Sequence, residues 1–285
     1  MNFEYVQPHT LPEALTALAQ HGDEAKIIAG GTAVVLMLQQ RLIAPAALIS
    51  LGRVPDLDYI RLEADGLHIG PLTLLRKVEQ ATVVREHFPA LARACGEVGN
   101  VRVRNQATLG GNLAEADYAA DPPSMLLALN TSVVASTAAG SRTIPLSEFF
   151  YGFFTTALEP EEAITDIIIP RPDPGTRMAY LSYKSRSSED RPCVAVSAVG
   201  VFDQGVCRDL RVAIGAACEI PIRLAQIEAQ AREHQLSEAL IDEIAAAYAS
   251  NIETLDDLRG SAWYRRKMIQ VHVRRALEEI RNGRR

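Results

Sequence analysis

Residues 103–113 read VRNQATLGGNL, and they contain a glycine pair that fits no regular pattern of apolar residues. Gly110 and Gly111 stand where they would weaken either a helix or a strand. The stretch from 101 to 114 is therefore predicted to be irregular, with regular elements on both sides. Such a segment is a common place for binding residues.

A second glycine pair lies in KIIAGGT, residues 26–32. Residues 25–29, which are apolar except for Lys26, predict a buried strand, the pair Gly30 and Gly31 predicts a turn, and residues 33–40 predict a helix. A strand, a glycine turn and a helix are the outline of a phosphate-binding segment.

Both glycine pairs offer the same physical opportunity. A pyrophosphate carries two negative charges, and backbone N–H groups approach it only where no side chain intervenes. Thr32, Thr108 and Asn112 add side-chain donors beside the glycines. Two such loops can hold a diphosphate from both sides. Neither fits G-x-G-x-x-G or G-x-x-x-x-G-K, so the sequence does not support a nicotinamide-binding domain or a nucleotide-hydrolysing loop.

The rest of the chain predicts two domains, with their boundary in the proline-rich segment 170–175. Helices are predicted by apolar periodicity and capping residues over 11–20, 73–80, 88–98, 124–129, 223–233, 237–250 and 261–281. Strands are predicted over 47–50, 59–62, 67–70, 132–136, 164–169, 179–184, 193–202 and 208–214.

Length and composition restrict the class of protein. A chain of 285 residues is long for one core, so two domains are expected. The formal net charge of −6 gives no footprint for nucleic acid, and the longest uncharged stretch, residues 27–40, is too short and too interrupted to span a membrane. The N-terminus lacks the pattern of a secretory signal, which predicts a cytoplasmic protein.

The ionisable residues do not predict a metal site or a hydrolytic centre. The four cysteines and six histidines follow no metal-ligand spacing, and no Ser-His-Asp set or carboxylate pair of defined spacing is visible. No metal and no independent catalytic residue are therefore expected in this chain.

Nearly the whole chain resembles the FAD-binding medium subunits of the xanthine dehydrogenase and carbon monoxide dehydrogenase family of molybdenum hydroxylases. The matching pieces are KIIAGGT at 26–32, VRNQATLGGNL at 103–113 with Asp121-Pro122-Pro123 behind it, Tyr183-Lys184 with Arg186 and Asp190, Gly215 with Pro221 and Arg223, and RGSAWYR at 259–265.

The resemblance implies an α+β fold with two domains. Residues 1–175 would form a two-lobed FAD-binding domain of the p-cresol methylhydroxylase type. Residues 176–285 would form a smaller C-terminal domain of the CO dehydrogenase flavoprotein type, built of an antiparallel sheet and a three-helix bundle.

The resemblance also implies a set of FAD-binding residues. The two glycine loops would hold the pyrophosphate, Asp121 would hydrogen-bond to the cofactor, Ile164 would pack on the flavin ring, and the cation of Lys184 would hold up the flavin reduction potential. Two alternatives stay open, a solvated strand lysine at Lys184 and a plain core residue at Ile164. The implied residues are Ile28, Ala29, Gly30, Gly31, Thr32, Ala33, Thr108, Gly110, Gly111, Asn112, Asp121, Ile164 and Lys184.

Two departures from the family pattern bear on the site. Position 33 is alanine where relatives often have a polar or acidic residue, which puts one cofactor contact in doubt. The chain also lacks the cysteine-rich insertion that some relatives use for an additional iron-sulfur cluster.

The function implied by the resemblance is electron transfer. A large molybdopterin-binding subunit and a small subunit with two two-iron two-sulfur clusters would be partners, in a dimer of heterotrimers, and this chain would pass electrons through FAD to NAD, a quinone or dioxygen. Two alternatives remain, a free-standing FAD oxidoreductase and a scaffold subunit that has lost its cofactor. The substrate of the complex and its electron acceptor are not specified by this sequence.

Overall fold

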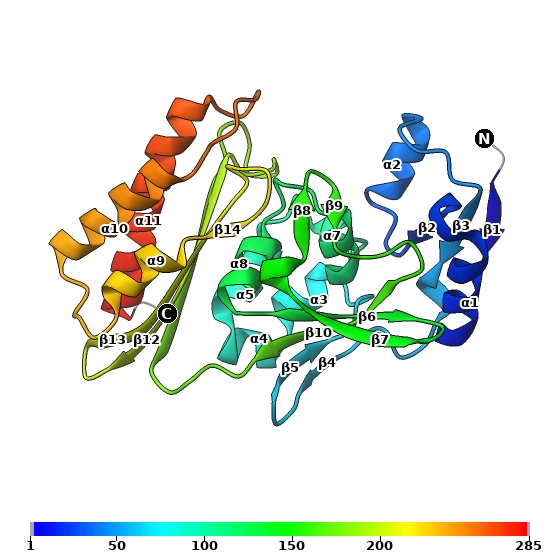
Figure 1. The fold of residues 1–285 in the computed structure, drawn as a ribbon, viewed down its shortest axis with the longest axis horizontal. Helices are drawn as coiled ribbons and strands as arrows, with labels where there is room; N and C mark the ends of the chain where they lie inside the picture. Colours follow the sequence, from blue (N-terminus) through cyan, green and yellow to red (C-terminus); the bar gives the residue numbers. More distant parts are fainter. Residues whose placement is uncertain (1–2, 284–285) are drawn as a thin grey trace.

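The computed structural model describes residues 3–283 and begins with a small lobe built on a parallel sheet. Its strands run in the order β1-β3-β2, and α1 packs on the sheet through Leu15 and Leu18 (Figure 1). The elements of this first lobe are β1 (Glu4–Val6), α1 (Leu11–His21), β2 (Ala25–Ile28), α2 (Val34–Gln39) and β3 (Ala47–Ser50), with short 3-10 turns at Gly22–Glu24 and Leu51–Arg53.

Helix α1 confirms the predicted capping pattern with one difference. The N–H of Glu13 donates to Oγ1 of Thr10 at 3.3 Å, as expected of an N-cap threonine. The carboxylate of Glu13 accepts from the N–H of His9 at 2.8 Å rather than from the N–H of Thr10. The helix therefore starts where the sequence indicates.

The second lobe is an antiparallel sheet covered by helices, with strand order β4-β5-β10-β6-β7. Its strands are β4 (Ile60–Leu62), β5 (Gly66–Ile69), β6 (Ser132–Thr137), β7 (Gly140–Pro145) and β10 (Ala163–Pro170), and a separate hairpin pairs β8 (Phe150–Gly152) with β9 (Thr155–Thr156). Its helices are α3 (Leu75–Gln80), α4 (Thr82–His87), α5 (Pro89–Gly96), α6 (Val101–Arg104), α7 (Leu109–Glu115) and α8 (Pro122–Ala128), with a 3-10 turn at Leu146–Glu148.

The prediction that residues 101–114 are irregular was wrong, because this stretch forms the two short helices α6 and α7. Both begin at a side-chain cap. Oδ1 of Asn100 accepts from the N–H groups of Arg102 and Val103, and Oγ1 of Thr108 accepts from the N–H of Gly111. Helices of one to two turns carry too few residues for a periodic apolar stripe, so the caps were their main signal.

The C-terminal domain is an antiparallel sheet in the order β11-β12-β13-β14, followed by helices. Its strands are β11 (Thr176–Tyr183), β12 (Val194–Asp203), β13 (Val206–Gly215) and β14 (Ile222–Arg223), and its helices are α9 (Ala225–Glu228), α10 (Glu238–Asn251) and α11 (Ala262–Asn282). The predicted helix over 223–233 was wrong in its extent. Arg223 belongs to β14, and α9 passes into a 3-10 turn at Ala229–Ala231.

Side chains from both faces of β12 are buried, which explains its nearly continuous apolar sequence. Ala195 and Val199 join the core of the second lobe, whereas Val194, Val196 and Ala198 join the core formed with α10 and α11. The C-terminal sheet therefore lies between the second lobe and its own helices (Figure 1).

The predicted fold class is confirmed: the molecule has helices and mostly antiparallel sheets arranged as two lobes and a C-terminal domain. The division at residue 175, between β10 and β11, stays a proposal. Among residues 3–283 there is no helix with the length and apolar character needed to cross a membrane.

Candidate functional site

The first glycine loop lies in direct contact, at Gly30, with Gln106, which leads into the second glycine loop and is 76 residues away in the chain. A Cβ added at Gly30 would stand 1.8 Å from the carbonyl oxygen of Gln106, which only a glycine avoids. Gly31 adopts φ +73°, a left-handed conformation that favours glycine. The first loop is thus shaped by its glycines and is held against the segment that leads into α7.

The second loop is the first turn of α7. Its two glycines meet different surroundings: a Cβ at Gly110 would lie 2.5 Å from Cβ of Pro71, whereas a Cβ at Gly111 would meet Oγ1 of Thr108 at 2.8 Å and then Ala29 at 4.0 Å. Gly110 therefore permits close packing within the lobe. Gly111 faces the first loop across a space that a larger side chain would enter.

Asn112 carries the clearest sign that this region is built for a ligand. Within residues 3–283, its Oδ1 atom is buried and accepts no hydrogen bond. A buried polar atom left in this state costs about 1–3 kcal/mol, so it needs an explanation such as a bound group. FAD offers hydroxyl donors to Oδ1 and phosphate acceptors to the amide N–H groups, so the residues present fit that cofactor.

The remaining predicted residues of the first loop are placed at its two ends. Ile28 ends β2, where it pairs with Ser50, and Ala33 is the N-terminal flanking residue of α2 and contributes no side-chain cap. Thr32 lies in the turn between them and is partly buried. The structure therefore brings Ala29 to the second loop, while the contact of Ala33 with a cofactor stays a prediction.

Asp121 lies immediately before α8 and is 3% exposed. The hydroxyl of Tyr180 donates to its Oδ1 at 2.6 Å. Burial raises the pKa of Asp121 to about 7, with a further increase from the charge of Glu97, while the Tyr180 hydrogen bond and the charge of Lys184 act in the opposite direction. This carboxyl therefore titrates near neutral pH, unlike an exposed aspartate.

Lys184 follows β11 and is buried, with 7% of its side chain exposed. Its ammonium donates to the carbonyl oxygens of Glu97 at 2.5 Å and Ser188 at 3.0 Å, and it lies 3.3 Å from Oε2 of Glu97. This burial does not fit the alternative of a solvated strand lysine. Its charge acts on Asp121, so the structure groups these two predicted residues.

Ile164 lies in β10 and is 6% exposed within the core of the second lobe. The strand shifts register against β6 between Ile164 and Asp166, and α7 packs on β10. This position is near the second glycine loop in the fold, but the core contacts alone also account for an isoleucine here. The contact of Ile164 with the flavin ring therefore stays a prediction.

Two groups at the site were missed by sequence reasoning, namely Glu97 and Tyr180. Glu97 is 87 residues from Lys184, and Tyr180 is 59 residues from Asp121, so no local spacing pointed to either pair. A third grouping that was not predicted lies on the β4–β5 hairpin, where ligand atoms of Glu63, Asp65 and His68 come within 4.8 Å of one another.

The hairpin grouping is explained by ion pairing. Nδ1 of His68 lies 2.6 Å from Oδ2 of Asp166, and its Nε2 lies 3.1 Å from Oδ1 of Asp65. Burial lowers the pKa of His68, but the hydrogen bonds and charges of Asp166 and Asp65 outweigh it and raise the pKa above its usual value. The contacts of the imidazole with these two carboxylates account for the positions of His68 and Asp65.

Comparison with protein families identifies the site formed by the two glycine loops. The family model for the FAD binding domain in molybdopterin dehydrogenase matches residues 1–172, and the model for the CO dehydrogenase flavoprotein C-terminal domain matches residues 179–280. The chain belongs to the flavoproteins of the molybdopterin dehydrogenases. The predicted family and its cofactor, FAD, are confirmed.

Curated relatives of this flavoprotein match along its full length. The glyceraldehyde dehydrogenase medium chain of Sulfolobus acidocaldarius is 31% identical over 278 residues, which cover 98% of each chain. The 6-hydroxypseudooxynicotine dehydrogenase complex subunit alpha of Paenarthrobacter nicotinovorans is 33% identical, over 97% of this chain and 93% of that one.

Solved structures agree with the same assignment. Carbon monoxide dehydrogenase from Hydrogenophaga pseudoflava, in a form lacking the Mo-pyranopterin moiety, superposes with a TM-score of 0.94 at 31% identity and covers 98% of this chain and 96% of that chain. Quinoline 2-oxidoreductase from Pseudomonas putida 86 gives 0.92 at 27% identity, with coverages of 99% and 98%. The flavoprotein is therefore the medium subunit of a multi-subunit oxidoreductase, with an FAD-binding domain.

Proposed function

We propose that this subunit accepts electrons from two-iron two-sulfur clusters of a small partner subunit and passes them through FAD to an external acceptor such as NAD, a quinone or dioxygen. FAD supplies the redox chemistry when bound, because a flavin exchanges electrons singly or in pairs. The protein supplies position, electrostatics and protection from water. The observation that carries the proposal is the contact between the two glycine loops beside Asn112, whose buried Oδ1 offers an acceptor to a ligand.

The predicted residues of the two glycine loops fall into three groups with different tasks in this proposal. Backbone N–H groups of Gly30 and Gly31 bind the pyrophosphate, and Gly111, whose own N–H donates to Thr108, leaves space for it because it has no side chain. Thr32, Thr108 and Asn112 add side-chain hydrogen bonds, and Ile28 and Gly110 hold the loops in place by packing.

The flavin end of the cofactor would lie by Lys184, Asp121 and Ile164. A buried ammonium stabilises negative charge that develops nearby, because the low local dielectric strengthens the interaction. Lys184 is held by Glu97 and Ser188, so its position is fixed before the cofactor binds. Asp121, whose pKa lies near 7, can hold or release a proton at Oδ1 or Oδ2 in the ordinary pH range.

The assembly is the second part of the proposal. We infer a large molybdopterin-binding subunit and a small iron-sulfur subunit as partners in the cytoplasm, arranged as a dimer of heterotrimers. Support comes from relatives named as medium chains or as subunits of dehydrogenase complexes. Exposed apolar side chains on this chain, among them Leu258 at 93% and Trp263 at 65% exposure, are compatible with further contacts.

Co-purification tests the assembly directly. The chain is tagged and isolated from its own host under mild conditions, and iron, molybdenum and flavin are measured together with the subunit masses. The proposal expects two further polypeptides, iron and molybdenum in fixed proportion to flavin, and a mass of two heterotrimers by light scattering. A flavin-containing chain isolated alone, with neither metal at any salt concentration, would support a free-standing oxidoreductase instead.

A further inference from the structure

The loop between α7 and α8 connects two of the residues assigned to FAD. It leaves α7 at Ala116, which adopts φ +49°, and reaches Asp121 at the start of α8. Asn112 lies four residues before Ala116, so a displacement of this loop would move both Asn112 and Asp121. The contacts that fix the loop therefore bear on the site.

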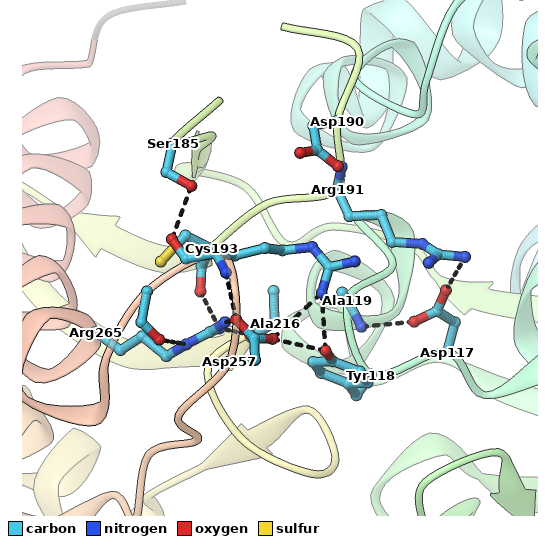
Figure 2. A network of polar contacts seen from close by, with 12 residues as sticks. Asp117, Tyr118, Ala119, Ser185, Asp190, Arg191, Cys193, Ala216, Asp257 and Arg265 are labelled. Carbon is cyan, nitrogen blue, oxygen red and sulfur yellow. Dashed lines mark hydrogen bonds and ion pairs between the residues drawn. The ribbon is translucent and has the colours of Figure 1, made fainter. Parts of the chain in front are cut away.

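Tyr118, in the middle of this loop, is bound to the C-terminal domain. Its hydroxyl donates to Oδ2 of Asp257 at 2.8 Å and accepts from Nη1 of Arg259 at 2.9 Å (Figure 2). Its carbonyl oxygen accepts from the N–H of Ala216 at 3.1 Å. Its ring packs edge-to-face on Phe153, with centroids 5.2 Å apart.

Asp257 receives these contacts in a fixed position because it also neutralises a buried cation. Arg265 is wholly buried, and its Nη2 donates to Oδ1 of Asp257 at 2.5 Å. Nη1 of Arg265 donates to the carbonyl oxygens of Cys193, at 2.6 Å, and Ala216 (Figure 2). A buried guanidinium without a counter-charge is strongly destabilising, so this carboxylate has little freedom to move.

The charge state of Asp257 is constant over the ordinary pH range. Burial acts to raise its pKa, but hydrogen bonds from Tyr118, the N–H of Arg259 and Arg265 outweigh burial and lower the pKa to about 2. The Tyr118 hydroxyl therefore meets a permanent carboxylate, and hydrogen bonds to charged acceptors are stronger than those between neutral groups.

A second tie joins the same loop to the segment that carries Lys184. Nη2 of Arg191 lies 2.8 Å from Oδ2 of Asp117, and Oδ1 of Asp117 accepts from the N–H of Ala119 at 3.1 Å (Figure 2). Arg191 is 59% exposed, so solvent screening makes this ion pair the weaker tie. The contacts of Tyr118, whose partners Asp257 and Arg259 are only 22% and 19% exposed, are expected to hold the loop more strongly than this ion pair.

We propose that Tyr118 and Asp257 are positioning residues for FAD, which hold the α7–α8 loop to the C-terminal domain and so set the places of Asn112 and Asp121. The inference rests on the proposed FAD site. It gives the C-terminal domain a second role at the cofactor site, besides that of Lys184, although neither Tyr118 nor Asp257 is assigned a contact with the cofactor.

The test compares two matched substitutions in the full-length chain freed of flavin. Tyr118→Phe removes only the hydroxyl and keeps the ring on Phe153. Tyr248→Phe removes a hydroxyl that donates to the carbonyl oxygen of Val212 at 2.8 Å inside the C-terminal core, remote from the α7–α8 loop. FAD is added in a fluorescence titration to obtain Kd, and the unfolding temperature of each flavin-free chain is recorded.

The proposal expects Tyr118→Phe to raise Kd for FAD about tenfold, the effect of losing one hydrogen bond to a charged group, and Tyr248→Phe to leave Kd within about twofold. Equal Kd values for Tyr118→Phe and wild type would overturn it. So would a rise in Kd that follows the loss of unfolding temperature in the same proportion for both substitutions. A wild-type chain that binds no FAD would overturn the proposed function, and this inference with it.

A double substitution tests the route of the effect. If the hydroxyl acts through Asp257, adding Tyr118→Phe to Asp257→Asn should not raise Kd further. Additive effects on Kd would show that Tyr118 acts independently of Asp257 and would contradict the proposed pairing. Asp257→Asn leaves Arg265 buried without its counter-charge, so the double substitution is measured only where the Asp257→Asn variant folds. Tyr118→Phe alone decides the main claim.

Discussion

The carbonyl oxygen of Gln106 occupies the space that any side chain at Gly30 would need, since an added Cβ would stand 1.8 Å from it. Residues from the first and second lobes thus meet backbone to backbone. This contact sets the separation of the two glycine loops. It also explains why position 30, which is distant from α7 in the sequence, requires a glycine.

Gly30→Ala should lower both stability and FAD affinity. A methyl group cannot enter without moving one backbone away from the other, and such overpacking costs about 1–3 kcal/mol. The free energy of unfolding of the flavin-free chain is measured in urea, with Gly140→Ala as the control because nothing lies within 4 Å of its added Cβ. Equal stability of the two variants would show that the loop contact is not formed in solution.

Gly111→Val should abolish FAD retention while the chain still folds. The added Cβ meets only Oγ1 of Thr108 closely, so loss of that helix cap costs about 1 kcal/mol, whereas the larger side chain enters the space beside Ala29. The measurement is flavin absorbance per chain after gel filtration. Normal FAD content in a folded variant would remove the first turn of α7 from the site.

Asn112→Ala should separate ligand binding from stability. The substitution removes a buried acceptor that has no partner among residues 3–283, so the flavin-free chain should be as stable as wild type or slightly more so. FAD affinity should fall about tenfold, which a fluorescence titration would detect. If the variant is destabilised and binds FAD normally, the amide has a structural task instead.

Asp121→Asn should flatten the pH dependence of stability. The pKa of Asp121 rises from 3.8 to about 7 on folding, so the folded state binds the proton more tightly and stability declines as pH increases between those values. The decline amounts to at most about 4 kcal/mol at 1.36 kcal/mol per pKa unit. Urea unfolding of the flavin-free chain at pH 5 and pH 8 gives the slope, and identical slopes in the two proteins would contradict the burial argument.

Two substitutions at the Lys184 pair should shift the flavin potential in opposite directions. Lys184→Met removes a cation and should lower the reduction potential, whereas Glu97→Gln removes a neighbouring anion and should raise it. The shifts should be on the order of tens of millivolts, because partly screened unit charges interact by about 1–4 kcal/mol. Potentials come from reductive titration with reference dyes. Unchanged values in both variants would leave Lys184 with a structural role only.

The elements predicted best from the sequence are those in which buried apolar residues recur at regular spacing. Helix α1 has both its cap at Thr10 and its stripe of leucines, and β12 is a nearly continuous apolar run because both of its faces are covered. The helix predicted over 223–233 was wrong in its extent because Arg223 pairs with Ala213 in the sheet while its guanidinium bonds to Glu228. Those contacts depend on strand pairing, which a local pattern does not contain.

The loops of the candidate site could be predicted from the sequence, whereas the hydrogen-bond partners of the other site residues could not. Glycine pairs with neighbouring hydroxyl and amide groups are visible in the sequence, and the family resemblance supplied Asp121, Ile164 and Lys184. The partners of those residues, such as Glu97 for Lys184 and Tyr180 for Asp121, come from segments 59 to 87 residues away. Only the packed fold brings such groups together.

The visible absorption spectrum of the chain, purified from its own host, tests the central claim most directly. The account predicts flavin bands that correspond to one FAD per chain and that persist through gel filtration. A colourless protein that takes up no added FAD would contradict it.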